Sequence, residues 1–481
     1  MFKLKKDKET DFKNYISDEE INQGINRLDL QEGKRSLLAI TWPIFIDLAL
    51  NFATLIINMM MVGAVSVDAV AELTVGNQVF DLALIIFNFI NIGVCVVCAQ
   101  ALGAGNKKLV RRLVHTGYGI NIITGTIVSL GVFFFAPLIV EVMNVPDEIS
   151  QSSQSYLAIL SLCFLPQALC LVSAAILRAF ECTRDAMYVS LLINLITMLG
   201  NSMFLFGWFN MPVLGVEGVA VSTVIGRVIA CLVYVPLILR RTKIRIIPRF
   251  LFDFKKKIFA AILNIGLPGA GENLSWHSQY MFMTAVVASM GAIPLATHGI
   301  YFQMVLIMML FSISIAMGTE ILIAHYAGAL QLDLAYKQLM RSVKIGMCAT
   351  ILITFSIPLG TGKFIISQFT DSLEVLALAT PIFLLTVIQE PGRILNIIII
   401  NSLRAVGDTK FPLIMAVISM WGISVPLGCF LGLHCGLGLL GVWIGFAADE
   451  WVRGISMFLR WRSRVWEKAA KLNYQKHLQQ A

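Results

Sequence analysis

Charged residues are scarce in this chain of 481 residues, because Asp, Glu, Lys and Arg together make up only 14% of it. A soluble domain contains about a quarter of such residues, since its surface must face water. Hydrophobic residues reach 57%, and they gather in apolar runs that recur along the chain. A bilayer core of roughly 30 Å needs about 20 such residues per helix. The composition therefore excludes a soluble protein and predicts an all-α integral membrane protein.

Several functional motifs are also missing from the sequence. None of the six histidines lies in a metal-ligand spacing. No G-x-x-x-x-G-K-[ST] loop occurs, so we expect the energy for any transport to come from an ion gradient instead of ATP. Most of the nine cysteines lie inside apolar runs, and the Cys95-x-x-Cys98 pair within such a run indicates packing residues. We therefore expect no enzymatic activity and no cofactor.

The formal net charge of +8 could indicate a nucleic-acid partner, but the positions of the basic residues argue against one. Of the 37 Lys and Arg residues, 33 fall in the tails or in alternate short loops, including the turns at Arg178 and Arg404, and the opposite loops contain only Lys363. The positive-inside rule then places both termini in the cytoplasm. We expect a multi-pass protein of the inner (plasma) membrane, with the lipid bilayer as its surroundings and no nucleic acid as a partner.

The apolar runs predict twelve transmembrane helices. A polar, mixed-charge tail at residues 1–35 has no signal-peptide pattern and could hold an amphipathic helix. We expect a first six-helix lobe at 36–239, a cytoplasmic linker at 240–257, a second six-helix lobe at 258–460, and a cytoplasmic tail at 461–481. The spans are predicted at 36–62, 77–102, 113–140, 153–179, 186–207, 215–239, 258–289, 296–327, 340–362, 374–404, 411–433 and 438–460.

The two lobes share a sequence pattern with an offset of about 225 residues. Pro43 and Asp47 match Pro268 and Glu272, so the first helix of each lobe has an acid four residues after a proline. Because each lobe has an even number of spans, both enter the membrane the same way, as parallel repeats. Other matching pairs are Gln78 with Gln303, Gly103 with Gly328, Arg178 with Arg404, Gly215 with Gly438, and Arg227 with Arg453.

These landmarks resemble the multidrug and toxic compound extrusion (MATE) family over nearly the whole chain. The resemblance rests on the segments LGAGNKKLVRR, LRAFECTRDA, LGVEGVAVSTVIGR, GLPGAGENLSW and QEPGRILNIIIINSLRAVGDTKFP. The Glu-Pro-Gly-Arg sequence in the tenth span places the chain nearest a bacterial branch. The resemblance implies a twelve-helix fold and efflux of organic cations and other amphiphiles in exchange for Na⁺ or H⁺.

Two positions depart from the family pattern. Many prokaryotic members have an aspartate in the first helix where this chain has Asn58. Many members also have a glutamate eight residues after the proline of the seventh helix, where this chain has Trp276, with Glu272 one turn earlier. The ion site that the resemblance implies must therefore be centred on other residues of this chain.

Three intramembrane acids are candidates for that site. Asp47 lies about 16 Å along its predicted helix, and Glu272 and Glu390 lie about 21 Å from the cytoplasmic ends of theirs. A charged side chain at mid-membrane costs at least about 2.5–3.5 kcal/mol, so each acid must be paired, protonated or in contact with water. Arg393 could pair with Glu390 at i,i+3, next to Pro391. Both a structural pair and a functional site remain open there.

Other polar residues in the spans are weaker candidates. His277 follows Trp276 in the seventh span, and either a packing role or a role as a proton carrier in a cation-binding site is open for it. Arg227 and Arg453 occupy equivalent repeat positions, and Arg453 could pair with Asp449 at i,i+4. We interpret these arginines as structural.

The predicted function is exchange of a cationic or amphiphilic small molecule for H⁺ or Na⁺ at shared carboxylates, with alternating access. A Na⁺ ion could bind at Asp47, Glu272 or Glu390, and no other metal is expected. The alternative is a flippase for lipid-linked or amphiphilic metabolites, which would need clustered basic residues in the cavity, where only Arg393 qualifies. We expect a monomer.

Overall fold

The computed structural model describes residues 36–480 apart from 357–361, 363 and 365–371. The possible helix in the N-terminal tail and Lys363 lie outside the described residues. Across the part that is described, the chain is almost entirely helical and contains no strand. The prediction of an all-α protein is therefore confirmed.

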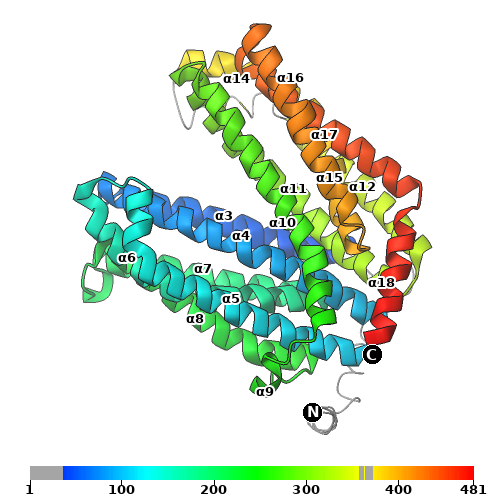
Figure 1. The fold of residues 1–481 in the computed structure, drawn as a ribbon. Coiled ribbons are helices and arrows are strands. Elements are labelled where there is room, and N and C mark those ends of the chain that lie inside the picture. Colours follow the sequence, from blue (N-terminus) through cyan, green and yellow to red (C-terminus); the bar gives the residue numbers. More distant parts are fainter. Residues whose placement is uncertain (1–35, 357–361, 363, 365–371, 481) are drawn as a thin grey trace. The chain divides into compact units, whose positions relative to one another are not determined.

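The first compact unit includes residues Trp42–Gly266. Within it, α6 packs against α4, α5, α7 and α8 and so forms the centre of the unit. The linker that we predicted at 240–257 is partly helical, because α8 continues to Thr242 and the single turn α9 follows. The helices of this unit are α3 (Leu37–Gly63), α4 (Val67–Gly103), α5 (Lys107–Val142), α6 (Asp147–Ala179), α7 (Thr183–Phe206), α8 (Gly215–Thr242) and α9 (Pro248–Leu251), coloured blue to green in Figure 1.

The second unit includes residues Leu267–Gln479 and also Ser36–Thr41. Here α14 takes the central place and packs against α11, α12, α15 and α17. Its helices are α10 (Lys256–Ala288), α11 (Ala292–Gly328), α12 (Leu332–Phe355), α14 (Leu373–Ala405), α15 (Lys410–Ser419), α16 (Val425–Cys429), α17 (Gly438–Arg462) and α18 (Trp466–Gln480), coloured green to red in Figure 1.

Helix lengths reproduce the sequence repeat. The second helix of each unit has 37 residues, and these helices begin at 67 and 292 and end at 103 and 328. The fourth helix of each has 33 residues and spans 147–179 or 373–405. Matching bounds fix the correspondence between the two units residue by residue. The prediction of two six-helix repeats is therefore confirmed.

The boundary between the units falls inside α3 and α10 instead of between helices. Residues 36–41 belong to the second unit, and the first unit extends from Trp42 to Gly266. In the first unit, the start of α10 lies so close to α4 that Gly93 and Gly266 leave no room for a Cβ atom. In the second unit, a Cβ atom added at Gly318 of α11 would likewise collide with the Thr41 side chain. Both boundaries lie two residues before a helix proline, Pro43 or Pro268.

Ten helices of the described residues are long and apolar enough to cross a membrane. The two others of the predicted twelve are α10, which contains Glu272 and several small or polar residues, and α17, which contains Asp449, Glu450 and Arg453. Their lower hydropathy comes from the polar groups described below. Several helices also extend beyond the predicted spans. Lys337, for example, lies in the second turn of α12 and not in a loop.

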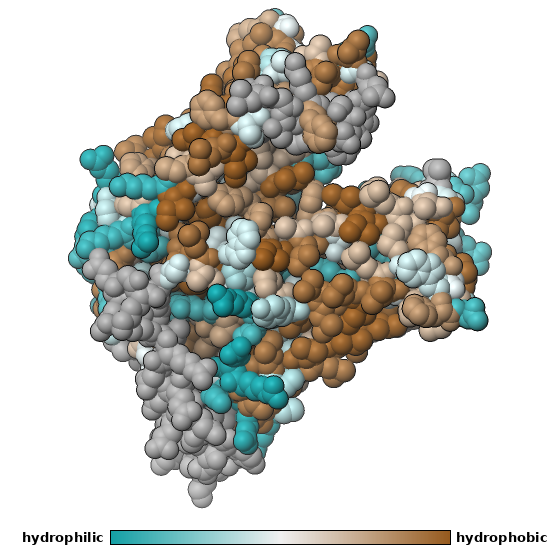
Figure 2. Space-filling view, turned by 180° about the vertical axis from the view of Figure 1, so that it is seen from behind, coloured by the Kyte–Doolittle hydropathy of each residue, from teal (hydrophilic) through white to brown (hydrophobic). Residues whose placement is uncertain are grey.

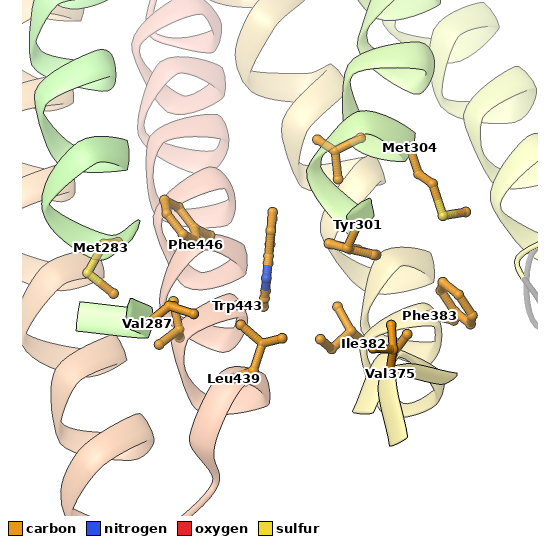
Figure 3. Packing of buried hydrophobic residues seen from close by; sticks show 13 residues of the cluster. Met283, Val287, Tyr301, Met304, Val375, Ile382, Phe383, Leu439, Trp443 and Phe446 are labelled. Carbon is orange, nitrogen blue, oxygen red and sulfur yellow. The ribbon is translucent and has the colours of Figure 1, made fainter. Parts of the chain in front are cut away.

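Large apolar side chains cover much of the outer surface, as lipid contact requires. Phe134, Leu232 and Leu352 are 69%, 69% and 75% exposed, and Figure 2 shows broad apolar areas on one face. Each unit also has its own interior. In the second unit, the Trp443 ring lies between Tyr301 and Phe446, with centroid distances of 4.5 and 5.2 Å (Figure 3).

The fifth helix differs between the repeats. In the first unit α7 is a regular α-helix. In the second, the equivalent segment is α15, the π-helical turn η3 (Met420–Ser424), α16 and the π-helical turn η4 (Phe430–His434). π-Helical turns occur frequently at functional sites because they change the direction of the side chains that follow.

Candidate functional site

Asp47 of α3 is paired inside the first unit. Its Oδ2 atom lies 2.9 Å from Nη2 of Arg178, and its Oδ1 atom accepts a 2.9 Å hydrogen bond from Nδ2 of Asn51. Asn51 also reaches Ser190 of α7 at 3.2 Å. Asp47 is 7% exposed. The acid is thus a buried member of a polar contact that joins α3, α6 and α7.

Glu272 of α10 has an equivalent partner in the second unit. Its Oε2 atom lies 3.7 Å from Nη2 of Arg404 in α14. The Arg404 guanidinium lies against Gly269, where an added Cβ would come 3.1 Å from Nη1. Arg178 and Arg404 occupy the same repeat position, so the acid–arginine pair itself is duplicated. The 3.7 Å contact is an ion pair without a hydrogen bond.

The two arginines lie at the ends of the spans predicted at 153–179 and 374–404, directly before the turns between helices. Arg178 lies in the last turn of α6 and Arg404 in the last turn of α14. An arginine side chain is long enough to reach back from a helix end to an acid within the membrane. The signal for these pairs was already present, since both members of each pair recur at matching repeat positions.

Glu390 is part of a larger charged cluster that joins α14 to α17. Nη1 of Arg393 donates a 2.6 Å hydrogen bond to Oε1 of Glu390, which confirms the predicted i,i+3 pair. Nε of Arg393 also lies 3.3 Å from Glu450. Arg453 pairs with Asp449 at 2.6 Å, as predicted, and with Glu450 at 3.4 Å. Glu450 therefore connects the two arginines, a role that the sequence pattern did not indicate.

This cluster contains three carboxylates against two guanidinium groups. All five residues are buried. Asn396 donates a 2.8 Å hydrogen bond to Glu450, while Oε2 of Glu390 is buried without a hydrogen-bond partner. With every group ionised, the formal charge of the cluster is −1. A net charge inside the membrane is costly, so the charges of this cluster are not balanced by its own residues when all of them are ionised.

Pro391 and Gly392 shape the helix beside Glu390. Proline has no N–H to donate within the helix. Gly392 leaves space for the Trp451 ring, whose Cδ1 atom would lie only 2.9 Å from a Cβ added at this glycine. Nε1 of Trp451 then donates a 2.8 Å hydrogen bond to the carbonyl of Ile388. The lack of a side chain at Gly392 thus lets Trp451 of α17 approach and donate to a backbone carbonyl of α14.

The remaining candidates make aromatic or amide contacts. Trp276 stacks on Tyr280 with a centroid distance of 6.0 Å and on Phe302 at 6.2 Å, all within the second unit. His277 contacts Trp276 edge-on at 5.0 Å. In the first unit, Asn58 accepts a 2.8 Å hydrogen bond from Asn201. Trp276 therefore belongs to a row of half-buried aromatic rings, whereas Asn58 belongs to a polar contact between α3 and α7.

Comparison with known proteins gives a consistent result. The MatE family model matches residues 43–203 and 268–430, once in each half. A protein of Bacillus subtilis named "Uncharacterized transporter YisQ" is 39% identical over 90% of this chain and 94% of its own length. A Thermotoga maritima protein named "Probable multidrug resistance protein NorM" is 27% identical over 96% of this chain and 97% of its own length.

Solved structures show the same fold. One described as "Crystal structure of MATE in the bent conformation" superposes with a TM-score of 0.83 at 18% identity, and the match covers 94% of this chain and 99% of that one. Both the sequence and the fold thus match over nearly the full length of the chain.

Proposed function

The chain belongs to the MatE family of membrane transporters, and from this premise we propose that it exports cationic or amphiphilic drugs in exchange for H⁺ or Na⁺. A multi-pass protein of this family is not an enzyme. We further propose that it works in the plasma membrane of a bacterial cell, with both termini in the cytoplasm, because the basic residues gather in alternate loops.

The charged cluster between α14 and α17 is the observation that carries the ion-exchange proposal. Its formal charge of −1 and the partnerless Oε2 atom of Glu390 favour binding of a proton or Na⁺. A bound cation would neutralise the cluster, and a cationic drug near the same carboxylates would compete with that cation. Competition of this kind couples entry of one cation to release of the other.

Aromatic rings in the same unit support the choice of substrate class. Trp276, Tyr280 and Phe302 present stacked flat surfaces, and Tyr280 and Phe302 have centroids 4.1 Å apart. Flat apolar rings bind planar organic cations through stacking and cation–π attraction. We propose Trp276 as a contact for such substrates.

The flippase alternative has less support. A lipid-linked pyrophosphate would need arginines that are available for its charge. In the second unit, Arg393 and Arg453 are each already bound to two carboxylates. No buried arginine of that cluster is therefore available for a phosphate group.

Ethidium efflux from cells that express the chain tests this proposal, with external Na⁺ and pH varied independently. We expect efflux to depend on one of the two ion gradients and Glu390→Gln to remove that dependence. Glu374→Gln is the matched control, because Glu374 is an exposed residue in the first turn of the same helix.

Two results would count against the proposal. Efflux that is absent under every ion condition, with folded protein in the membrane, would mean that such drugs are not substrates. Efflux that keeps its full ion dependence in Glu390→Gln would remove the α14–α17 cluster from the coupling.

A further inference from the structure

Two cysteine side chains of the first unit are in direct contact. Sγ of Cys170 in α6 lies 3.5 Å from Sγ of Cys231 in α8, although 61 residues separate them along the chain. Both are free thiols; Cys170 is buried, and Cys231 is partly exposed. An S–S bond is about 2.05 Å long, so the two sulfur atoms need to approach by only about 1.5 Å to form one.

The contacts of the two thiols with the backbone are reciprocal. The Cys231 thiol donates a 3.1 Å hydrogen bond to the carbonyl of Pro166, one helical turn before Cys170. The Cys170 thiol lies 3.5 Å from the carbonyl of Arg227, one turn before Cys231. Each sulfur thus reaches the helix of the other, and the pair lies in the interface where α6 packs against α8.

Arg227 adds a positive charge to the helix face that holds Cys231. The two residues are four apart in α8, so their side chains are neighbours on that helix. Nε of Arg227 is buried without a hydrogen-bond partner. No ion pair of the described residues includes this arginine. A guanidinium without an acid beside it stabilises negative charge on a nearby sulfur, and such surroundings make a cysteine reactive.

The second unit balances the equivalent arginine in another way. There, Arg453 pairs with Asp449 at 2.6 Å and with Glu450 at 3.4 Å. The corresponding positions of α8 are Thr223 and Val224, which carry no charge. The first unit therefore combines an arginine that lacks acidic partners with a pair of thiols in contact.

We propose that Cys170 and Cys231 form a modification site, at which a hydroperoxide produces a reversible disulfide bond between α6 and α8. The Cys231 sulfur reacts first because it is partly exposed. It attacks the hydroperoxide, the O–O bond breaks, and sulfur retains one oxygen as a sulfenic acid. The thiol proton passes to the other oxygen, which leaves as an alcohol, or as water when the oxidant is hydrogen peroxide.

Cys170 completes the reaction. Its sulfur attacks the sulfur of the Cys231 sulfenic acid, the S–S bond forms, and the hydroxyl group leaves with the Cys170 proton as water. The two thiols together lose two electrons, and the hydroperoxide gains them. The new bond ties α8 to α6, the helix at the centre of the first unit, so oxidation restricts rearrangements of the helices in this unit.

Peptide mapping of the purified full-length protein tests the inference without any transport assay. The protein is treated with hydrogen peroxide, the remaining thiols are alkylated, and the denatured chain is digested with trypsin. Cleavage after arginine releases peptide 228–240, whose only cysteine is Cys231, and peptide 113–178, which contains Cys163 and Cys170. We expect a disulfide-linked product of these two peptides, a loss of two free thiols per chain, and recovery of both with dithiothreitol.

Substitutions identify the thiols that react. Cys170→Ser and Cys231→Ser should each abolish the linked product. Cys163→Ser is the matched control, because Cys163 lies in the same peptide and the same helix as Cys170, and this variant should retain the product. Arg227→Met should slow formation of the product by about tenfold, whereas Arg227→Lys should keep most of the rate because it retains a positive charge. A thermal melt of each variant confirms that it is folded.

Three results would contradict the inference. Folded wild-type protein that gives no linked product with hydrogen peroxide would overturn it. So would a product that persists in Cys170→Ser and disappears in Cys163→Ser. A rate in Arg227→Met equal to that of the wild type would overturn the part assigned to Arg227.

Discussion

Replacement of Arg393 by methionine removes the guanidinium that contacts both Glu390 and Glu450. The contacts of 2.6 and 3.3 Å are lost together, and the Glu390 carboxylate loses the ion pair that compensates its charge. Removal of one member of a buried ion pair costs about 3–5 kcal/mol, because a charge is left without compensation. We expect Arg393→Met to lower the free energy of unfolding by about that amount.

Replacement of the acid Glu390 is expected to lower the free energy of unfolding by less than replacement of Arg393. In Glu390→Gln, Arg393 retains Glu450, and the formal charge of the cluster changes from −1 to zero. The cost should be about 1.5 kcal/mol, the lower end for a hydrogen bond to a charged group. In the double variant Glu390→Gln/Arg393→Met, residue 390 has no charge, so the loss of the guanidinium leaves no uncompensated carboxylate at that position. The double loss should therefore be smaller than the sum of the single losses by about 1–3 kcal/mol.

Unfolding of the purified variants in detergent, followed by circular dichroism, measures these differences. The less buried pair of Arg464 and Glu467 at 3.1 Å is a suitable control, because ion pairs near the surface contribute little. Losses that add to within about 0.5 kcal/mol in the buried pair would refute the reasoning. They would mean that Arg393 and Glu390 do not compensate each other energetically.

Three other outcomes are expected. Asp47→Asn and Glu272→Gln should each abolish ethidium efflux while a thermal melt still shows folded protein. If both variants export ethidium at the wild-type rate, these acids have no role in transport. Trp276→Ala should weaken ethidium binding by about tenfold in a fluorescence titration, which corresponds to a loss of about 1.4 kcal/mol. Trp276→Phe should keep most of the affinity, because it retains a flat ring. Equal losses of affinity in the two variants would argue against stacking. A cysteine introduced at Arg245 in the linker should react with an impermeant maleimide only after the cells are permeabilised, and labelling of intact cells would reverse the predicted orientation.

Much of the fold could be predicted from the sequence, because long apolar runs and the repeat pattern are local or periodic signals. The pair of Glu390 and Arg393 was also accessible, since residues three apart on a helix lie side by side. Spans α10 and α17 were predicted although their hydropathy is lower. There the repeat and the alternation of basic loops compensated for the weak apolar signal.

The partners of Asp47 and Glu272 could not be read from their own helices. Their arginines come from α6 and α14, and the distance along the chain exceeds 130 residues in each case. Glu450 was missed for a related reason. Its contact with Arg393 of α14 arises from tertiary packing and not from the spacing within α17.

The division of α3 and α10 between the units has a consequence for how the chain could be cut. A break in the 240–257 linker would give two fragments, and the second fragment would carry residues 256–266, which belong to the first unit. The first fragment would carry residues 36–41, which belong to the second unit. Each fragment would thus hold a piece of the other's fold. The exchanged segments have the pattern of a domain swap, in which each half of the chain contributes a short helical piece to the other unit.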